Sequence, residues 1–448
     1  MKHFKEIIRV SLPLVASTAS YTVLTFTDRM FLSWYSAEAI AASVPAMVLS
    51  FAFICFFMGT GQYVNVLIAQ FYGASQNDNV ARSFWQGVYF SIFAGLVLLL
   101  FIPLGNLIID VSGHSPEVIV QEKLYFDVLM YGAGLVVMVN VLAAYYSGRG
   151  RTNVVMYTSF LGAAVNIFLN YILIFGKFGL PEMGIKGAGL ATVLANAFIV
   201  LFYAIIIFGG KDRRKIPVSR YIGFNWRIFS KLIRFGAPNG FQFFIDVSSF
   251  TAFIFLIGLH GDDILAASNI VLSVNMLAFM PIVGFGQATS ILVGQYMGRK
   301  DQESVVSITW DTIKVAALYG VAVSCTFIVF PEFYLQFFKS DDAVAFAKIT
   351  EAAIPFFMVL PSFLIADTFA IIIGSALGGA GDTKFKMWFS IFGACALFVP
   401  IQFLILRTFN ISAIFGWVWL SLYWAIVGFV FWLRFKRGIW RNIDMVGH

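Results

Sequence analysis

About twelve apolar stretches follow one another along this chain, each long enough to cross the hydrocarbon core of a membrane as a helix. Such a core is roughly 30 Å thick and takes about 20 helical residues to cross. Hydrophobic residues make up 60% of the chain and charged residues 12%. The stretches are uniformly apolar and not alternating, so they predict an all-α integral membrane protein and not a β-barrel. We expect twelve transmembrane helices at residues 8–34, 39–71, 84–108, 121–146, 152–175, 185–208, 233–259, 263–297, 305–332, 345–378, 384–407 and 411–434.

Two distant parts of the chain carry the same spaced residues, which predicts two parallel copies of one six-helix unit. The first copy has Pro13, Ala41, Ala42, Gly59, Gly61, Gln62, Gln70 and Gly73, and each returns 225 positions later, from Pro238 to Gly298. A Gly-x-Gly-x-Thr pattern at Gly148 returns after 231 positions at Gly379. We therefore expect two pseudo-symmetric six-helix bundles. The predicted divisions are an N-terminal lobe (1–208), a cytoplasmic linker with an interfacial amphipathic helix (209–232) and a C-terminal lobe (233–448).

Basic residues concentrate in every second connection, which predicts the orientation of the chain. Loops rich in Lys and Arg stay in the cytoplasm during insertion. We therefore expect a multi-pass protein of the cell (inner or plasma) membrane with both termini in the cytoplasm. The basic residues of these connections are Arg82; Arg149 and Arg151; Lys211, Arg213, Arg214, Lys215 and Arg220; Arg299 and Lys300; and Lys384 and Lys386.

The remaining composition argues against an enzyme, a metalloprotein and a nucleic-acid-binding protein. The net charge of +7 mostly reflects the basic connections, so we expect no nucleic acid as a partner. The three cysteines fall in separate predicted spans, and the four histidines are scattered. The sequence contains no zinc, haem, nucleotide or nucleophile motif. We expect no cofactor, so any pumping must use an ion gradient.

Acidic residues inside the predicted spans indicate function, because an ion at the bilayer centre costs on the order of 3 kcal/mol or more. Asp246 lies twelve residues beyond Arg234, which is about 18 Å into the membrane at 1.5 Å per residue. Asp367 lies twelve residues past Pro355 and reaches a similar depth from the opposite face. Two carboxylates at this depth could share one proton or hold one sodium ion as a metal site.

Other polar residues of the spans are weaker candidates. Asp28 is either a further ion-coupling site or, with Arg29, a charged element near the end of the first span. The helical spacing of Asn239, Gln242, Asp246 and Ser249 predicts a polar stripe on one face. The substrate- or cavity-lining candidates are Asn239, Gln242, Ser249, Asn166, Asn170 and Asn275, although Asn166 and Asn170 are equally suited to hydrogen bonding between helices.

Several of these segments together resemble the multidrug and toxic compound extrusion (MATE) family over essentially the whole chain. They are the Pro238 to Asp246 spacing, the repeated Ala-Ala and Gly-x-Gly-Gln series, Asn166-x-x-x-Asn170 before Leu173-Ile174-x-Gly176, and Leu377-Gly378-Gly379-Ala380-Gly381-Asp382-Thr383. The resemblance implies two six-helix bundles flanking a central cleft. It also implies export of organic cations, driven by sodium ions or protons that enter from outside.

The chain is similar to the NorM-like branch of that family, which implies a cation site formed by an acid in span seven and an aspartate in span ten. Asp246 and Asp367 occupy these positions, with aspartate in span seven where the branch commonly has glutamate. The DinF-like branch resembles this chain at Asp28. Its usual aspartate in span five is replaced here by Asn170.

The sequence thus predicts a sodium- or proton-coupled multidrug antiporter that exports amphiphilic organic cations by alternating access. Its expected partners are these substrates and membrane lipids, and we expect a monomer. The alternative is a flippase of lipid-linked saccharides or other lipids from the same superfamily. That function would call for several cationic side chains facing a phosphate, and mid-span Lys or Arg is nearly absent.

Overall fold

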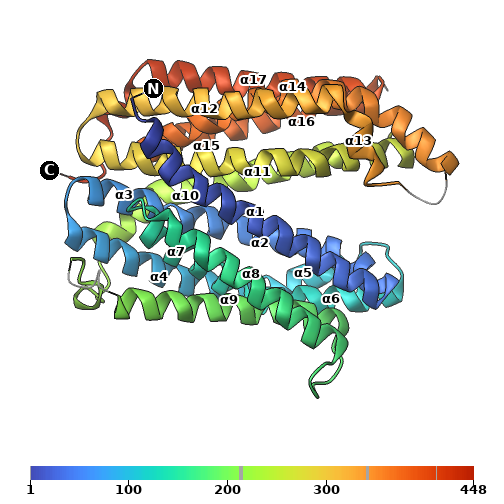
Figure 1. Cartoon of the computed structure of the whole chain (residues 1–448), viewed down its shortest axis with the longest axis horizontal. Coiled ribbons are helices and arrows are strands. Elements are labelled where there is room, and N and C mark those ends of the chain that lie inside the picture. Colours follow the sequence, from blue (N-terminus) through green and yellow to red (C-terminus); the bar gives the residue numbers. More distant parts are fainter. Residues whose placement is uncertain (1, 211–214, 340–342, 410, 448) are drawn as a thin grey trace. The chain divides into compact units, whose positions relative to one another are not determined.

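The computed structural model describes residues 2–210, 215–339, 343–409 and 411–447, and the regular elements in these ranges are helices (Figure 1). Among the described residues, eleven helices are long and apolar enough to cross a membrane. The pair α6 (Pro116–Tyr131) and α7 (Ala133–Ser147), bent by 41° at its break, gives a twelfth. The predicted all-helical membrane fold is therefore confirmed, with span four broken at Gly132. Lys211, Arg213 and Arg214 of the predicted basic connection lie outside the described residues.

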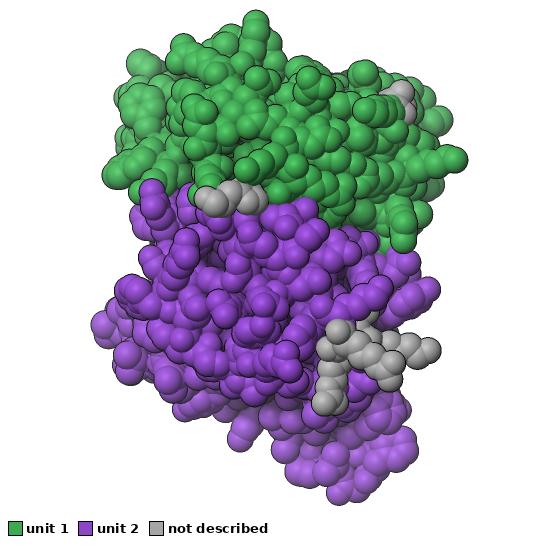
Figure 2. Space-filling model, turned by 90° about the vertical axis from the view of Figure 1, so that its left-hand side faces the viewer, with its two compact units in different colours: residues 1–15, 244–444 green, residues 16–243, 445–448 purple. Residues whose placement is uncertain are grey.

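The chain forms two compact units, which Figure 2 distinguishes by colour. Unit 1 consists of Met1–Val15 and Phe244–Asp444, and unit 2 consists of Ala16–Phe243 and the residues from Met445 onward. The helices of unit 2 are α2 (Ala37–Gln62), α3 (Val64–Gly73), α4 (Asn77–Leu99), α5 (Ile102–Asp110), α6, α7, α8 (Thr152–Phe175), α9 (Gly184–Gly209) and η2 (Val218–Arg220). Those of unit 1 are α11 (Asp262–Gly298), α12 (Gln302–Val329), α13 (Pro331–Gln336), α14 (Ala343–Ala380), α15 (Thr383–Phe392), η3 (Gly393–Phe398), α16 (Val399–Phe403), η4 (Leu404–Thr408), α17 (Ala413–Lys436) and η5 (Ile439–Asn442).

Two long helices belong to both units. The boundary between the units falls inside α1 (Phe4–Tyr35), after Val15, and inside α10 (Trp226–Gly258), after Phe243. Residues 226–232, which the sequence assigns to an interfacial helix of the linker, form the first turns of α10 in the structure. The reason is local: the Asn225 side chain caps this helix by accepting the Ile228 backbone N–H at 3.0 Å, and no break in the helix follows before Gly258.

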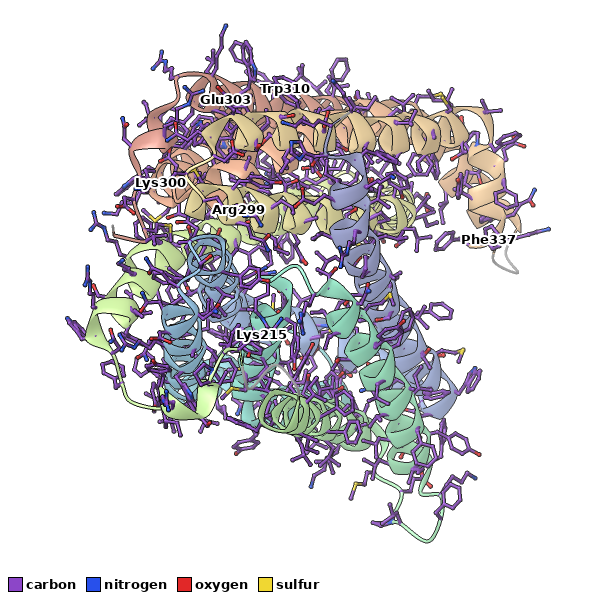
Figure 3. The ribbon with its side chains drawn as sticks, turned by 60° about the vertical axis from the view of Figure 1, so that its left-hand side comes forward. Lys215, Arg299, Lys300, Glu303, Trp310 and Phe337 are labelled. Atoms are coloured by element: carbon purple, nitrogen blue, oxygen red, sulfur yellow. The ribbon has the colours of Figure 1, made fainter. Side chains whose placement is uncertain are left out.

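The repeat seen in the sequence is also a repeat of backbone geometry. Ser75 and Lys300, 225 positions apart, follow α3 and α11 and both have a φ of +59°. In each turn the next backbone N–H donates to the carbonyl five residues earlier, at 2.9 Å from Gln76 and 3.0 Å from Asp301. Figure 3 shows Arg299 and Lys300 at the second of these turns. The shared residues therefore encode the same helix-ending turn twice.

A second pair of turns follows the Gly-x-Gly-x-Thr pattern. Gly150 has a φ of +75° and Gly381 a φ of +100°, conformations that glycine adopts at little cost. The following N–H groups, of Arg151 and Asp382, again donate to carbonyls five residues earlier, at 3.0 and 2.9 Å. These turns fix where α8 and α15 begin.

Close backbone contact between α4 and α7 gives a test of this packing. A Cβ atom built on Gly134 would lie 2.8 Å from the Cα of Gly95, closer than real Cβ atoms come to other groups. Gly134→Val should therefore lower the free energy of unfolding by about 1–3 kcal/mol through overpacking. The measurement is the apparent melting temperature of the detergent-purified protein, with Gly209→Val as control, because a Cβ atom there meets nothing within 4 Å. Equal melting temperatures for the two variants would contradict the packing described.

Candidate ion-coupling site

Asp246 and Asp367 both belong to unit 1, on α10 and α14. Asp367 is buried, with 2% of its surface exposed, and Asp246 is half-buried. The two carboxylates lie within electrostatic range of each other. Asp246 also lies within range of the Tyr423 hydroxyl on α17. The structure thus brings together two acids that are 121 positions apart in the sequence.

A tryptophan in the core of unit 1 explains how these two helices present their acids. The ring of Trp417 is fully buried, stacks on Phe356 of α14 at a centroid distance of 5.3 Å and contacts Phe253 of α10 edge-on at 5.8 Å. Asp246 precedes Phe253 by seven residues, and Asp367 follows Phe356 by eleven. Both spacings are close to whole numbers of helical turns, so each acid lies on the same face of its helix as the ring that contacts Trp417. Asp246 lies about 10 Å along α10 from Phe253, and Asp367 lies about 16 Å along α14 from Phe356.

Lys386 is a functional candidate that the sequence pattern places in a cytoplasmic connection. It lies in α15 and is buried, with 7% of its surface exposed, whereas Lys384 on the same helix is exposed. The Lys386 ammonium lies within electrostatic range of Asp246 and Asp382. A count of basic residues cannot reveal this, because it does not record which way a side chain points. The signal available in the sequence is the i, i+2 spacing, which puts two lysines on different sides of a helix.

A second buried acid in this region is fully paired. Asp382 precedes α15 and is 5% exposed. It accepts two hydrogen bonds from the guanidinium of Arg434 on α17, from Nε at 2.7 Å and from Nη2 at 3.3 Å. The same guanidinium lies over the ring of Phe385, 4.5 Å from its centroid. This fork-to-carboxylate geometry joins α17 to the start of α15.

The site offers few acidic ligands to a metal ion. In the described part of the chain, no group of three or more His, Cys, Asp or Glu side chains is placed to hold one. A sodium ion at Asp246 and Asp367 would need further oxygen ligands. Asn275 on α11 is buried in the same unit, and no described residue donates a hydrogen bond to its Oδ1. The Ser249 hydroxyl instead donates to the Ile245 carbonyl of its own helix at 2.7 Å.

Asp28 lies in unit 2, in a different polar cluster. Its Oδ1 accepts a hydrogen bond from Asn170 Nδ2 at 2.5 Å, and the same amide donates to Asn166 at 2.8 Å. Asn166 Nδ2 in turn donates to Thr192 on α9 at 3.4 Å. The neighbouring Arg29 is exposed. Asp28 therefore faces α8, and both asparagines act in hydrogen bonding between helices.

The polar stripe predicted on α10 divides between the units. Asn239 and Gln242 belong to unit 2, and Asp246 and Ser249 belong to unit 1. Asn239 Nδ2 donates to the Gly59 carbonyl of α2 at 3.0 Å. A Cβ atom on Gly59 would lie 2.9 Å from the Cα of Gly240, so α2 and α10 are in close contact here. Asn239 thus has a packing role within unit 2.

Comparison with known proteins identifies the family. The model of the MatE family matches residues 13–172 and 238–404, and the two matched segments begin 225 positions apart, as the repeat does. The chain belongs to the MatE family. It is accordingly a transporter and not an enzyme.

Named relatives of this MatE protein match over nearly its whole length. "Probable multidrug resistance protein NorM" of Thermotoga maritima is 26% identical over 416 residues, covering 92% of this chain and 88% of the relative. The protein of the same name from Neisseria meningitidis serogroup B is 27% identical over 433 residues, covering 94% and 91%.

Solved structures share the fold. One, described as "Outward-facing conformation of a multidrug resistance MATE family transporter of the MOP superfamily", matches with a TM-score of 0.89 at 21% identity, covering 98% of this chain and 97% of that one. Another, a MOP superfamily transporter from Pyrococcus furiosus whose description reports a reverse polarity of the binding pocket, matches with the same score, identity and coverage.

The ion pair between Arg434 and Asp382 generates a stability prediction. Arg434→Met leaves the buried Asp382 carboxylate without its partner, so the free energy of unfolding should fall by about 3–5 kcal/mol. The measurement is thermal unfolding in detergent. Lys436→Met on the same helix is the control, because Lys436 is exposed. In the double variant Arg434→Met with Asp382→Asn, part of the loss should be recovered; a double variant as unstable as the sum of the single ones would contradict the pairing.

Proposed function

We propose that this MatE protein is a multidrug antiporter that exports amphiphilic organic cations in exchange for a sodium ion or a proton. The observation that carries the proposal is that Asp246 and Asp367 lie within electrostatic range of each other inside one apolar unit. Buried acids within range of each other have a high affinity for a small cation or a proton. Relatives of similar length that bear the name multidrug resistance protein support the choice of substrate.

The exchange requires that the coupling ion and the organic cation favour different states of the protein. An external cation binds at Asp246 and Asp367, neutralises part of their charge and weakens the attraction for a bound organic cation, which leaves outward. The ion then dissociates into the cytoplasm, and a new substrate binds. At a membrane potential of 100 mV, each charge that moves inward contributes about 2.3 kcal/mol.

The orientation and assembly belong to the same proposal. Both termini lie in the cytoplasm, which the basic residues of alternate connections support, and the transporter works as a monomer. Asp28 remains a second candidate for ion coupling, in unit 2. The candidates for contact with substrate remain Asn166, Asn170, Asn239, Gln242, Ser249 and Asn275.

Transport by the purified protein in proteoliposomes tests the proposal. Wild type should move a fluorescent lipophilic cation such as rhodamine 6G when a sodium or pH gradient is imposed. Asp246→Asn and Asp367→Asn should each retain less than about 10% of that rate, because each removes a charge that binds the coupling ion. Asp311→Asn is the matched control. Asp311 is a buried acid of unit 1 that accepts the His3 backbone N–H at 3.2 Å, and asparagine keeps an acceptor there.

Two results would contradict parts of this proposal. A wild-type rate that neither gradient changes would exclude antiport. Normal transport by the two unit 1 variants, together with loss of transport in Asp28→Asn, would place ion coupling in unit 2.

A further inference from the structure

The Lys386 side chain lies along a glycine face of α14. A Cβ atom on Gly374 would lie 3.7 Å from Cε of Lys386, and one on Gly378 would lie 3.3 Å from its Nζ. These glycines lie seven and eleven residues from Asp367, with the ammonium beside the more distant one. Asp367, Gly374 and Gly378 therefore share one face of α14. Because these two positions lack side chains, a lysine from α15 fits beside the helix that carries the buried acid.

The charged and titratable groups around Lys386 come from four elements. Asp246 on α10 lies within electrostatic range of both Lys386 and Asp367, so it interacts with the ammonium and with the second acid. Asp382, also within range of Lys386, is already bound to Arg434 of α17. The uncharged titratable groups in this region are Tyr423 of α17 and Cys395 of η3.

The formal charges show what the ammonium does to this site. Asp382 is bound by Arg434, and the positive Lys386 ammonium also lies within electrostatic range of the Asp246 carboxylate. A sodium ion that binds at Asp246 and Asp367 is attracted by the carboxylates and repelled by the ammonium. In a buried site of low dielectric this repulsion is stronger than in water.

We propose that Lys386 is a built-in cation that opposes sodium binding at Asp246 and Asp367 and so weakens the affinity of this site for Na⁺. Sodium must bind against a positive charge that is a fixed part of the protein. The inference rests on the proposed role of Asp246 and Asp367 as the cation site.

Sodium binding to the purified full-length protein tests the inference without requiring transport. The dissociation constant for Na⁺ is measured by isothermal titration with NaCl, with KCl keeping the ionic strength constant. Lys386→Met removes the charge and keeps the length of the side chain against Gly374 and Gly378, so it should bind Na⁺ at least tenfold more tightly than wild type. Lys386→Gln should also bind Na⁺ more tightly, and it is used instead of Lys386→Met if the methionine variant does not fold.

Three control variants separate this effect from a change in surface charge. Lys384→Gln removes an exposed lysine two residues away and should leave the affinity for Na⁺ within about threefold of wild type, as should Lys386→Arg, which keeps the charge. Adding Asp246→Asn to Lys386→Met should abolish the gain. The inference would be overturned if neither Lys386→Met nor Lys386→Gln binds Na⁺ clearly more tightly than wild type, or if neither binds it at all. An equal gain in affinity for Lys384→Gln would overturn it as well.

The transport assay described above separates a failure of this inference from a failure of the proposed function. Coupled export with no change in Na⁺ affinity on replacing Lys386 would reject the role of Lys386 and leave the antiporter standing. Tighter Na⁺ binding in a protein that exports no organic cation under either gradient would reject the antiporter and leave the role of Lys386 standing.

Discussion

An ionised side chain inside an apolar helical unit is stable only beside opposite charges or hydrogen-bond donors, and the interior of unit 1 is arranged around this requirement. Asp382 is satisfied by the fork of Arg434. Asp246 lies within electrostatic range of both Asp367 and Lys386, so the second acid and the ammonium act on it in opposite senses. Under the proposed function, the opposing effects of these two groups determine how strongly the site attracts a cation.

The two units share a backbone plan but differ in chemistry. Positions 225 apart form the same helix-ending turn, with the same φ at Ser75 and Lys300. The charged residues do not follow this repeat, because Asp246 corresponds to Tyr21 at a shift of 225, and Lys386 corresponds to Val155 at a shift of 231. Unit 2 instead pairs Asp28 with an amide, that of Asn170. Duplication thus explains the common architecture, whereas later divergence explains why the aspartates lie at non-equivalent positions in the two units.

Much of this fold follows from the sequence because the bilayer leaves so few options. Backbone groups in hydrocarbon must be satisfied within the segment, so a long apolar stretch is a helix. The helices depart from the expected boundaries where a local contact outweighs the hydrophobic pattern. Span four breaks at Gly132, where a Cβ atom would meet Val193 of α9 at 2.3 Å. The linker helix expected before residue 233 is continuous with α10, because Asn225 caps the helix at its start.

By itself the sequence determined the helical membrane fold, the duplication, the placement of Asp246 and Asp367 within apolar helices and the resemblance to a transporter family, because each depends on the order and spacing of residues along one chain. Only the tertiary structure decided which side chains meet. It turned Asp28 toward Asn170, 142 positions away, and it placed Lys386, from an apparent loop, in the interior within electrostatic range of Asp246. The direction of a side chain is set by the helices that pack around it, and no count along the sequence contains that information.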